Sequence, residues 1–119
     1  MWKLVELTGA RDKAVEFATA AHAGATRADG VTPYVTHPLA VADLVELLGG
    51  DEETIIAAIL HDTIEDTEVT AEELAELFGP TVAAVVTELT FPAGTPHRRD
   101  KILAALPTLS DRAKIIKFA

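Results

Sequence analysis

Residues 55–60 form an unbroken apolar run, IIAAIL, that leads directly into His61 and Asp62. Glu65 and Asp66 follow three residues later, so four of the next six residues can ionise. An apolar run without a polar face indicates a helix that is buried on all sides. The pattern therefore predicts a central, buried helix that delivers a cluster of ionisable groups at its end.

Apolar residues recur at helical spacing along nearly the whole chain, which predicts one all-α domain over residues 1–119, a bundle of about six or seven helices. Asp51, Pro80 and the Thr70/Glu73 capping box mark helix starts. Helices are expected at 11–25, from Pro38 to Gly49, from Asp51 to His61, at 71–78, at 80–89, at about 97–105 and from Ser110. The expected buried stripes are Ala14, Phe17, Ala18, Ala21 and His22; Leu39, Ala42, Val45 and Leu48; Val82, Val85, Val86 and Leu89; Ala113, Ile116 and Phe118.

Composition narrows the possible functions. The 119 residues include no cysteine, which excludes disulfides and thiolate metal sites. Ten basic residues face nineteen acidic ones, so the net charge of −9 argues against a nucleic-acid partner. No apolar run approaches the ~20 residues of a membrane span, and the first residues do not resemble a secretory signal. We therefore expect a cytoplasmic protein without a membrane partner, and the sequence does not decide whether it forms an oligomer.

The spacing within the ionisable cluster favours a metal. His61 and Glu65 are four residues apart, and so are Asp62 and Asp66, so one further helical turn would bring all four side chains to one side. Three of these four groups are carboxylates, which repel one another at close range unless a cation is present. One pair could then bind an ion while the other handles water and protons. The alternative interpretation is a solvated C-terminal turn.

Four further residues are considered as members of the site. His37 lies in YVTHPLAVADLV, at or next to the start of a helix, where it could be a second imidazole ligand or an ordinary capping or surface residue. Arg27 lies on the preceding loop and could pair with a phosphate or be a surface cation. His22 falls on an apolar stripe and is interpreted as a core histidine. His97 lies beside two arginines and is interpreted as solvated.

The segments AAHAGATRADGVTPYVTHPLAVADLV, TIIAAILHDTIEDTEVTAEELAELFGPTVAAVVTELT and AKIIKFA together resemble the hydrolase domain of the RelA/SpoT homologues. The likeness runs from about residue 14 to residue 119 and is strongest to the small stand-alone alarmone hydrolases, the Mesh1-like members of the HD-domain superfamily. It implies an all-helical HD fold and Mn²⁺-dependent removal of the 3′-pyrophosphate from (p)ppGpp. A His/Asp ligand set would also suit Fe²⁺ or Zn²⁺.

The resemblance also implies roles for individual residues. His37, His61 and Asp62 would bind the metal. Glu65 and Asp66 would position and activate the attacking water. Arg27 matches the loop arginine near the nucleotide.

Three departures from the family pattern leave alternatives open. The family continues K-x-A-D-(R/K)-x-x-N, whereas this sequence ends at Lys117-Phe118-Ala119, one residue before the Asp that would be the fourth ligand, so we expect a domain cut short. Ala28 replaces a usual Lys, and the loop TFPAGTPHRRD lacks the frequent D-D-K. These differences keep two alternatives: an HD phosphohydrolase acting on another nucleotide, such as NADPH or a dNTP, and an inactive or regulatory HD fragment.

Overall fold

The computed structural model describes residues 2–90 and 96–118. For residues 2–8, 66, 98, 99 and 118 it describes the backbone only. These ranges contain helices and loops, with no β-strand beyond a single antiparallel bridge between Thr26 and Pro33. The prediction of an all-α fold is confirmed. The helices are α1 (Trp2–Ala21), α2 (Thr36–Leu47), α3 (Glu52–Leu60), α4 (Thr63–Asp66), α5 (Ala71–Phe78), α6 (Pro80–Glu88), α7 (Arg98–Ala105), the 3₁₀ turn η1 (Leu106–Thr108) and α8 (Asp111–Phe118).

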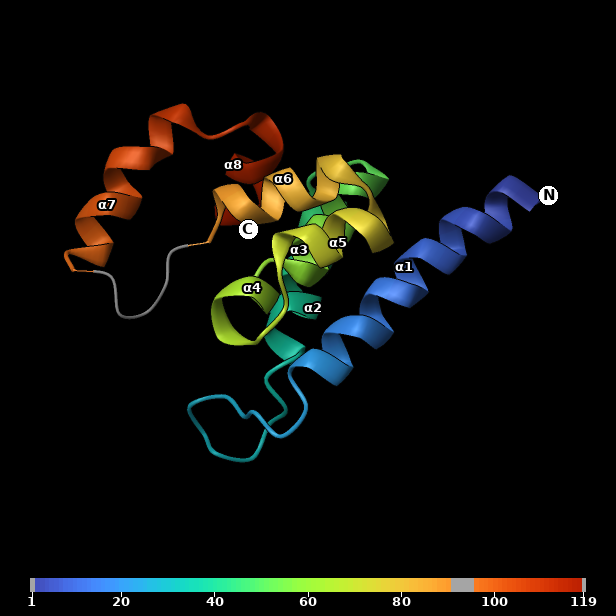
Figure 1. Cartoon of the computed structure of the whole chain (residues 1–119), viewed down its shortest axis with the longest axis horizontal. Coiled ribbons are helices and arrows are strands. Elements are labelled where there is room, and N and C mark those ends of the chain that lie inside the picture. Colours follow the sequence, from blue (N-terminus) through green and yellow to red (C-terminus); the bar gives the residue numbers. More distant parts are fainter. Residues whose placement is uncertain (1, 91–95, 119) are drawn as a thin grey trace.

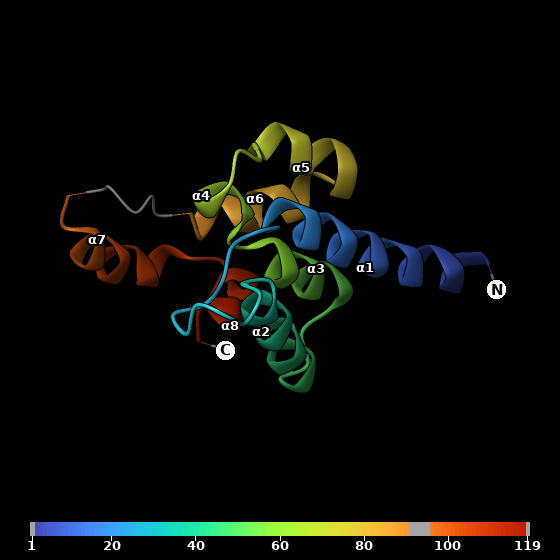
Figure 2. The ribbon, with the colours of Figure 1, turned by 90° about the horizontal axis from the view of Figure 1, so that it is seen from below.

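Helix α3 is the centre of the bundle, as the apolar run predicts. Every residue from 54 to 60 is buried, and α3 packs against α1, α2, α6 and α8. Figure 1 shows α3 surrounded by these helices, and Figure 2 shows α5 and α2 on opposite sides of it. The end of α3 is therefore held from several directions, which makes it a rigid place for a functional site.

The predicted helix starts have the expected hydrogen bonds. The Asp51 side chain caps α3 by accepting a hydrogen bond of 2.9 Å from the backbone N–H of Thr54. The Thr70 hydroxyl oxygen accepts one of 3.2 Å from the backbone N–H of Glu73 at the start of α5. Each side-chain oxygen satisfies an N–H group that has no partner within the helix.

Helix α3 ends at Leu60, within one residue of the predicted end at His61. The further turn that the spacing argument considered is not continuous with α3, because α4 begins at Thr63 after a turn formed by His61 and Asp62. The buried hydroxyl of Thr63 donates a hydrogen bond of 2.7 Å to the Leu60 carbonyl. This bond satisfies a carbonyl group at the helix end, where no backbone N–H of the same helix is available. The chain can therefore turn immediately after the buried segment.

Helix α1 differs from the predicted span. It runs over Trp2–Ala21, whereas the apolar stripe predicted 11–25. The following turn contains Gly24 at φ 85°, a left-handed backbone conformation that suits glycine and cannot continue a right-handed helix. His22 lies just after α1 and is 4% exposed, which confirms its interpretation as a core residue.

Leu48 was wrongly assigned to a buried stripe. It is 63% exposed because α2 ends at Leu47 and the chain turns away through Gly49, whose φ is 87°. The remainder of that stripe faces inward, with Ala42 and Val45 buried and Leu39 partly buried.

The last two helices confirm the predicted spans to within one residue, and Ala113 and Ile116 of α8 are buried as expected. The predicted inward position of Phe118 lies outside the described side chains. Figures 1 and 2 both show α7 projecting away from the bundle, whereas α8 returns to it and packs against α2, α3 and α6. Helix α8 therefore brings its side chains to the end of α3.

Candidate metal centre

Two imidazoles and one carboxylate meet at the end of α3. His61 Nε2 lies 3.3 Å from Asp62 Oδ1, and His37 Nε2 lies 3.6 Å from Asp62 Oδ2. One possible ligand atom from each of the three residues lies within 4.8 Å of the other two. Two atoms that each bind one ion at about 2.1 Å are separated by roughly 3.0–3.4 Å when their bond angle is between octahedral and tetrahedral. The donor set and its spacing therefore fit a divalent metal.

A backbone hydrogen bond orients the His61 ring. Its Nδ1 lies 2.6 Å from the carbonyl oxygen of Ala58, one turn earlier in α3. A carbonyl oxygen can only accept a hydrogen bond, so Nδ1 carries the proton. In the neutral ring, Nε2 then presents its lone pair toward Asp62, which is the usual arrangement of a metal-binding histidine.

Helix α2 supplies His37 from a different part of the chain. His37 is the second residue of α2, and the following Pro38 is buried where α2 meets the bundle. Because α2 packs against α3, the His37 ring comes edge-on to the His61 ring, with centroids 5.7 Å apart. The structure thus brings together the three residues that the sequence predicts as ligands.

A pocket of about 240 Å³ opens on this cluster. Glu65, on the single turn α4, lines it beside the three possible ligands, and Lys117 of α8 brings a positive charge to it. The carboxyl group of Asp66 lies outside the described side chains, so only its backbone position in α4 is given. The described lining residues are His37, Val41, His61, Asp62, Glu65, Leu89, Ile116 and Lys117.

Tyr34 is a contact of the cluster that the spacing argument missed. Its hydroxyl donates a hydrogen bond of 2.9 Å to Asp62 Oδ2. The signal was present in the sequence, because a phenol three residues before His37 lies on the loop that delivers that histidine. Thr63 was missed for another reason, since its importance comes from burial that no local pattern reveals.

Arg27 lies on the exposed loop before α2 and outside the described residues that line the 240 Å³ pocket. The loop is held by a backbone hydrogen bond of 2.8 Å from Arg27 to the Thr32 carbonyl. Hydrogen bonds to Asp29, first from the Thr32 hydroxyl and then from two backbone N–H groups, lower the pKa of this exposed carboxyl to about 2. Arg27 is therefore carried by an ordered turn, but the structure does not bring it into the cluster.

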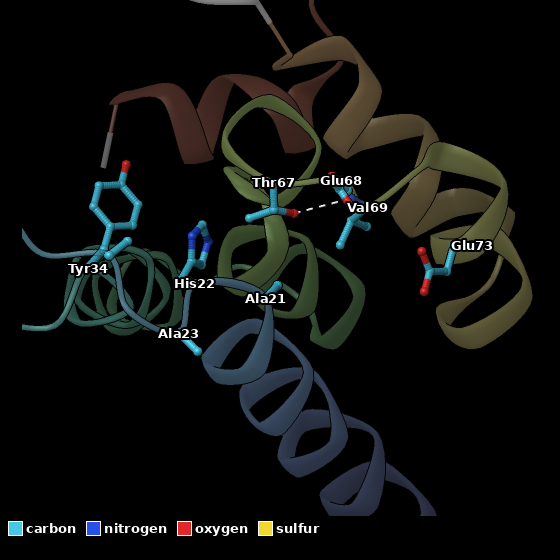
Figure 3. A pocket seen from close by; sticks show the side chains of 9 residues that line it. Ala21, His22, Ala23, Tyr34, Thr67, Glu68, Val69 and Glu73 are labelled. Atoms are coloured by element: carbon cyan, nitrogen blue, oxygen red, sulfur yellow. Dashed lines mark hydrogen bonds between the residues drawn. The ribbon is translucent and has the colours of Figure 1, made fainter.

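A larger pocket, of about 770 Å³, is shown in Figure 3. It is connected to the candidate metal centre through Tyr34, whose hydroxyl donates to Asp62. His22 and Tyr34 stand on one side of it and Glu73 on the other, with Thr67 between them. Tyr34 therefore lines this pocket with its ring while its hydroxyl reaches Asp62. No sequence pattern indicated this second pocket.

Together these features define an all-helical protein with a candidate metal centre at the end of its central helix. A family model described as "HD domain" matches residues 14–105, and the chain belongs to this family. The matched region contains His37, His61 and Asp62.

Several proteins of known name are similar to the chain. It is 51% identical over 78 residues to guanosine-3′,5′-bis(diphosphate) 3′-pyrophosphohydrolase of Aquifex aeolicus, covering 66% of this chain and 11% of that protein. It is 42% identical over 92 residues to the MESH1 enzyme of the same name from Danio rerio, covering 74% and 51%. It is 50% identical over 66 residues to the bifunctional (p)ppGpp synthase/hydrolase SpoT of Escherichia coli, covering 56% and 9%.

A solved structure shares the fold. It is that of a metazoan SpoT orthologue described as hydrolysing ppGpp, and it matches with a TM-score of 0.80 and 33% identity over 91% of this chain and 64% of that one. The chain spans at most about half the length of the curated relatives given above. The likeness therefore establishes the HD fold and concerns only a part of each of these longer proteins.

Proposed function

We propose that this chain is a metal-dependent hydrolase that removes the 3′-pyrophosphate from (p)ppGpp, and so takes part in alarmone degradation during a stringent response. The observation that carries the proposal is the meeting of His37, His61 and Asp62 in a pocket that Glu65 also lines. The choice of (p)ppGpp as the substrate rests on the relatives that are named for this reaction.

His37, His61 and Asp62 would hold the ion, and the proposed ion is Mn²⁺. Two imidazoles and a carboxylate suit Mn²⁺, Fe²⁺ and Zn²⁺ alike, so the choice of Mn²⁺ rests on the family resemblance. A bound divalent ion would stabilise negative charge on phosphate oxygens and lower the pKa of a bound water. The mixed nitrogen and oxygen donors of this site are consistent with that chemistry.

Glu65 and Asp66 are proposed to orient the attacking water and accept its proton. Glu65 lines the pocket from α4, one turn after the possible ligands, so a water in the 240 Å³ space can lie between its carboxylate and the cluster. To act as a general base, a carboxylate in this place must lie within hydrogen-bond reach of the water.

The charge of the chain bears on how it would bind a phosphorylated substrate. The net charge of −9 disfavours a nucleic-acid partner, and a small phosphorylated nucleotide would instead need local cations. Lys117 at the pocket and Arg27 on the loop before α2 are proposed for that role.

Within the described ranges, no helix is both long and apolar enough to cross a membrane. A cytoplasmic location remains part of the proposal.

A second candidate substrate is another nucleotide, such as NADPH or a dNTP. Ala28 stands where the family has a phosphate-facing cation, and this difference favours a changed substrate. An inactive or regulatory domain is the third reading, which the complete HDTIEDT motif argues against.

The test is an assay of the purified chain with ppGpp and Mn²⁺, measuring released pyrophosphate. Pyrophosphate release that stops with EDTA and in His61→Ala would support the proposal. Bound Mn²⁺ without release would rule out ppGpp, and preferential cleavage of NADPH or a dNTP in parallel reactions would support the second candidate. Absence of metal binding would favour the inactive domain.

A further inference from the structure

Tyr34 joins the loop before α2 to the possible metal ligand Asp62. Its hydroxyl donates a hydrogen bond of 2.9 Å to Asp62 Oδ2. The Asp62 side chain is only 15% exposed, so water competes poorly for this bond. The bond therefore fixes one of the two carboxylate oxygens of Asp62.

The Tyr34 ring is itself held in place. Its backbone N–H donates to the Ala25 carbonyl at 2.9 Å, across the loop. The ring packs against the buried His22 ring at a centroid distance of 5.0 Å, and against the His37 ring at 5.9 Å. These contacts on two sides restrict the ring, and they set the direction from which the hydroxyl approaches Asp62.

The two oxygens of Asp62 consequently have different surroundings. Oδ2 accepts the hydrogen bond from Tyr34 and lies 3.6 Å from His37 Nε2, whereas Oδ1 faces His61 Nε2 at 3.3 Å. A carboxylate that binds an ion through both oxygens must turn both toward it. A phenol bonded to Oδ2 competes with that arrangement and favours binding through Oδ1.

We infer that Tyr34 is a positioning residue that holds Asp62 as a one-oxygen metal ligand. The inference rests on the metal centre of the proposed function. It assigns no contact between Tyr34 and the reacting phosphate. Hydrogen-bond partners of metal ligands typically change metal affinity by about 10–100-fold when they are removed.

The test compares Tyr34→Phe with Thr32→Val in the full chain. Tyr34→Phe removes the hydroxyl and keeps the ring that packs against His22 and His37. Thr32→Val is the matched control, because the Thr32 hydroxyl also donates to a carboxylate on the same loop, that of Asp29. Mn²⁺ affinity is measured by calorimetry with the metal alone, and thermal unfolding of the metal-free proteins reports any general loss of stability.

We expect Tyr34→Phe to weaken Mn²⁺ binding by about tenfold. Thr32→Val should bind Mn²⁺ as the wild type does. Equal affinity of Tyr34→Phe and wild type would overturn the inference, as would an equal loss in both variants, since that would indicate a general effect of the loop.

Cobalt provides a second readout that loop stability does not affect. The visible absorption of bound Co²⁺ depends on its coordination number. Once the phenol is gone, Oδ2 can join Oδ1 on the ion, so Tyr34→Phe should change the Co²⁺ spectrum while Thr32→Val leaves it unchanged. Identical spectra in all three proteins would contradict the inference.

These measurements also separate the inference from the proposed function. A wild type that binds Mn²⁺ but releases no pyrophosphate from ppGpp would contradict the substrate, and the Tyr34→Phe comparison would still decide the role of Tyr34. A wild type that binds neither Mn²⁺ nor Co²⁺ would overturn both.

Discussion

Asp51 binds Arg112 across the bundle, with Arg112 Nη2 2.8 Å from Asp51 Oδ2. The same carboxylate caps α3 through its other oxygen, which accepts a hydrogen bond from the backbone N–H of Thr54. One side chain thus closes the start of the central helix and ties it to α8. This matters for the site, because α8 carries Ile116 and Lys117 to the wall of the 240 Å³ pocket.

Asp51→Ala should destabilise the protein by about 1 kcal/mol, the usual effect of losing an N-cap side chain. Asp51→Asn should cost less, because Asn caps a helix about as well as Asp does and loses only the exposed ion pair with Arg112. Urea unfolding of both variants measures the difference. Equal losses in the two would indicate that the ion pair, and not the cap, dominates.

Stability should also depend on pH through Asp51. Hydrogen bonds from Arg112 and then Thr54 hold the pKa of the Asp51 carboxyl well below its ordinary value of 3.8. A carboxyl whose pKa is lowered by folding stabilises the native state above its unfolded pKa, and this contribution is lost as the pH falls below it. The free energy of unfolding of the wild type should therefore exceed that of Asp51→Asn at pH 6, and the gap should narrow below about pH 4.

The sequence predicted the fold well where local chemistry decides it. Asp51, Thr70 and Pro80 fix helix starts through side-chain hydrogen bonds or a fixed φ angle, and these starts are confirmed. It was incomplete or wrong where tertiary packing decides. The separate turn α4 follows a buried hydrogen bond from the Thr63 hydroxyl that no local pattern reveals, and the exposure of Leu48 depends on where α2 leaves the core.

The candidate site shows the same division. The HD and ED pairs were recognisable from residue type and spacing, whereas His37 was assigned as a ligand through the family resemblance. The structure brings His37, His61 and Asp62 together. Their roles as ligands stay predictions. Tyr34 was missed because its place three residues before His37 does not reveal that its hydroxyl reaches Asp62, which lies 28 residues further along the chain.

Thr63→Val should disturb both stability and the site. The substitution keeps the shape of the buried side chain but removes the donor to the Leu60 carbonyl, a loss of about 1–3 kcal/mol for an unsatisfied buried polar group. Thr63→Ser keeps a hydroxyl and should retain most of that hydrogen bond. Chemical unfolding and Mn²⁺ titration check the pair. Unchanged Mn²⁺ affinity in Thr63→Val would show that the turn at His61 does not need this bond.

Metal binding should raise the melting temperature of the wild type. A ligand at 100 times its dissociation constant stabilises the folded state by about 2.7 kcal/mol if it binds only that state. His61→Ala should abolish the shift, because it removes one of three possible ligands. His97→Ala is the control, since His97 is exposed at the start of α7. Differential scanning fluorimetry with and without Mn²⁺ measures both, and a shift retained in His61→Ala would contradict the assignment.

Glu65→Gln should separate catalysis from metal binding. The amide nearly matches the size of the carboxylate that lines the 240 Å³ pocket, but it cannot accept a proton from water. We expect the turnover number on ppGpp to fall by about 10²–10⁴-fold, the usual contribution of a general base. Mn²⁺ affinity should stay close to that of the wild type.

Glu68→Gln provides the control for this prediction. Glu68 is an exposed side chain on the neighbouring 770 Å³ pocket, and its substitution changes the net charge by the same amount. Turnover that falls equally in both variants would attribute the effect to charge alone, and undiminished turnover in Glu65→Gln would remove Glu65 from the mechanism.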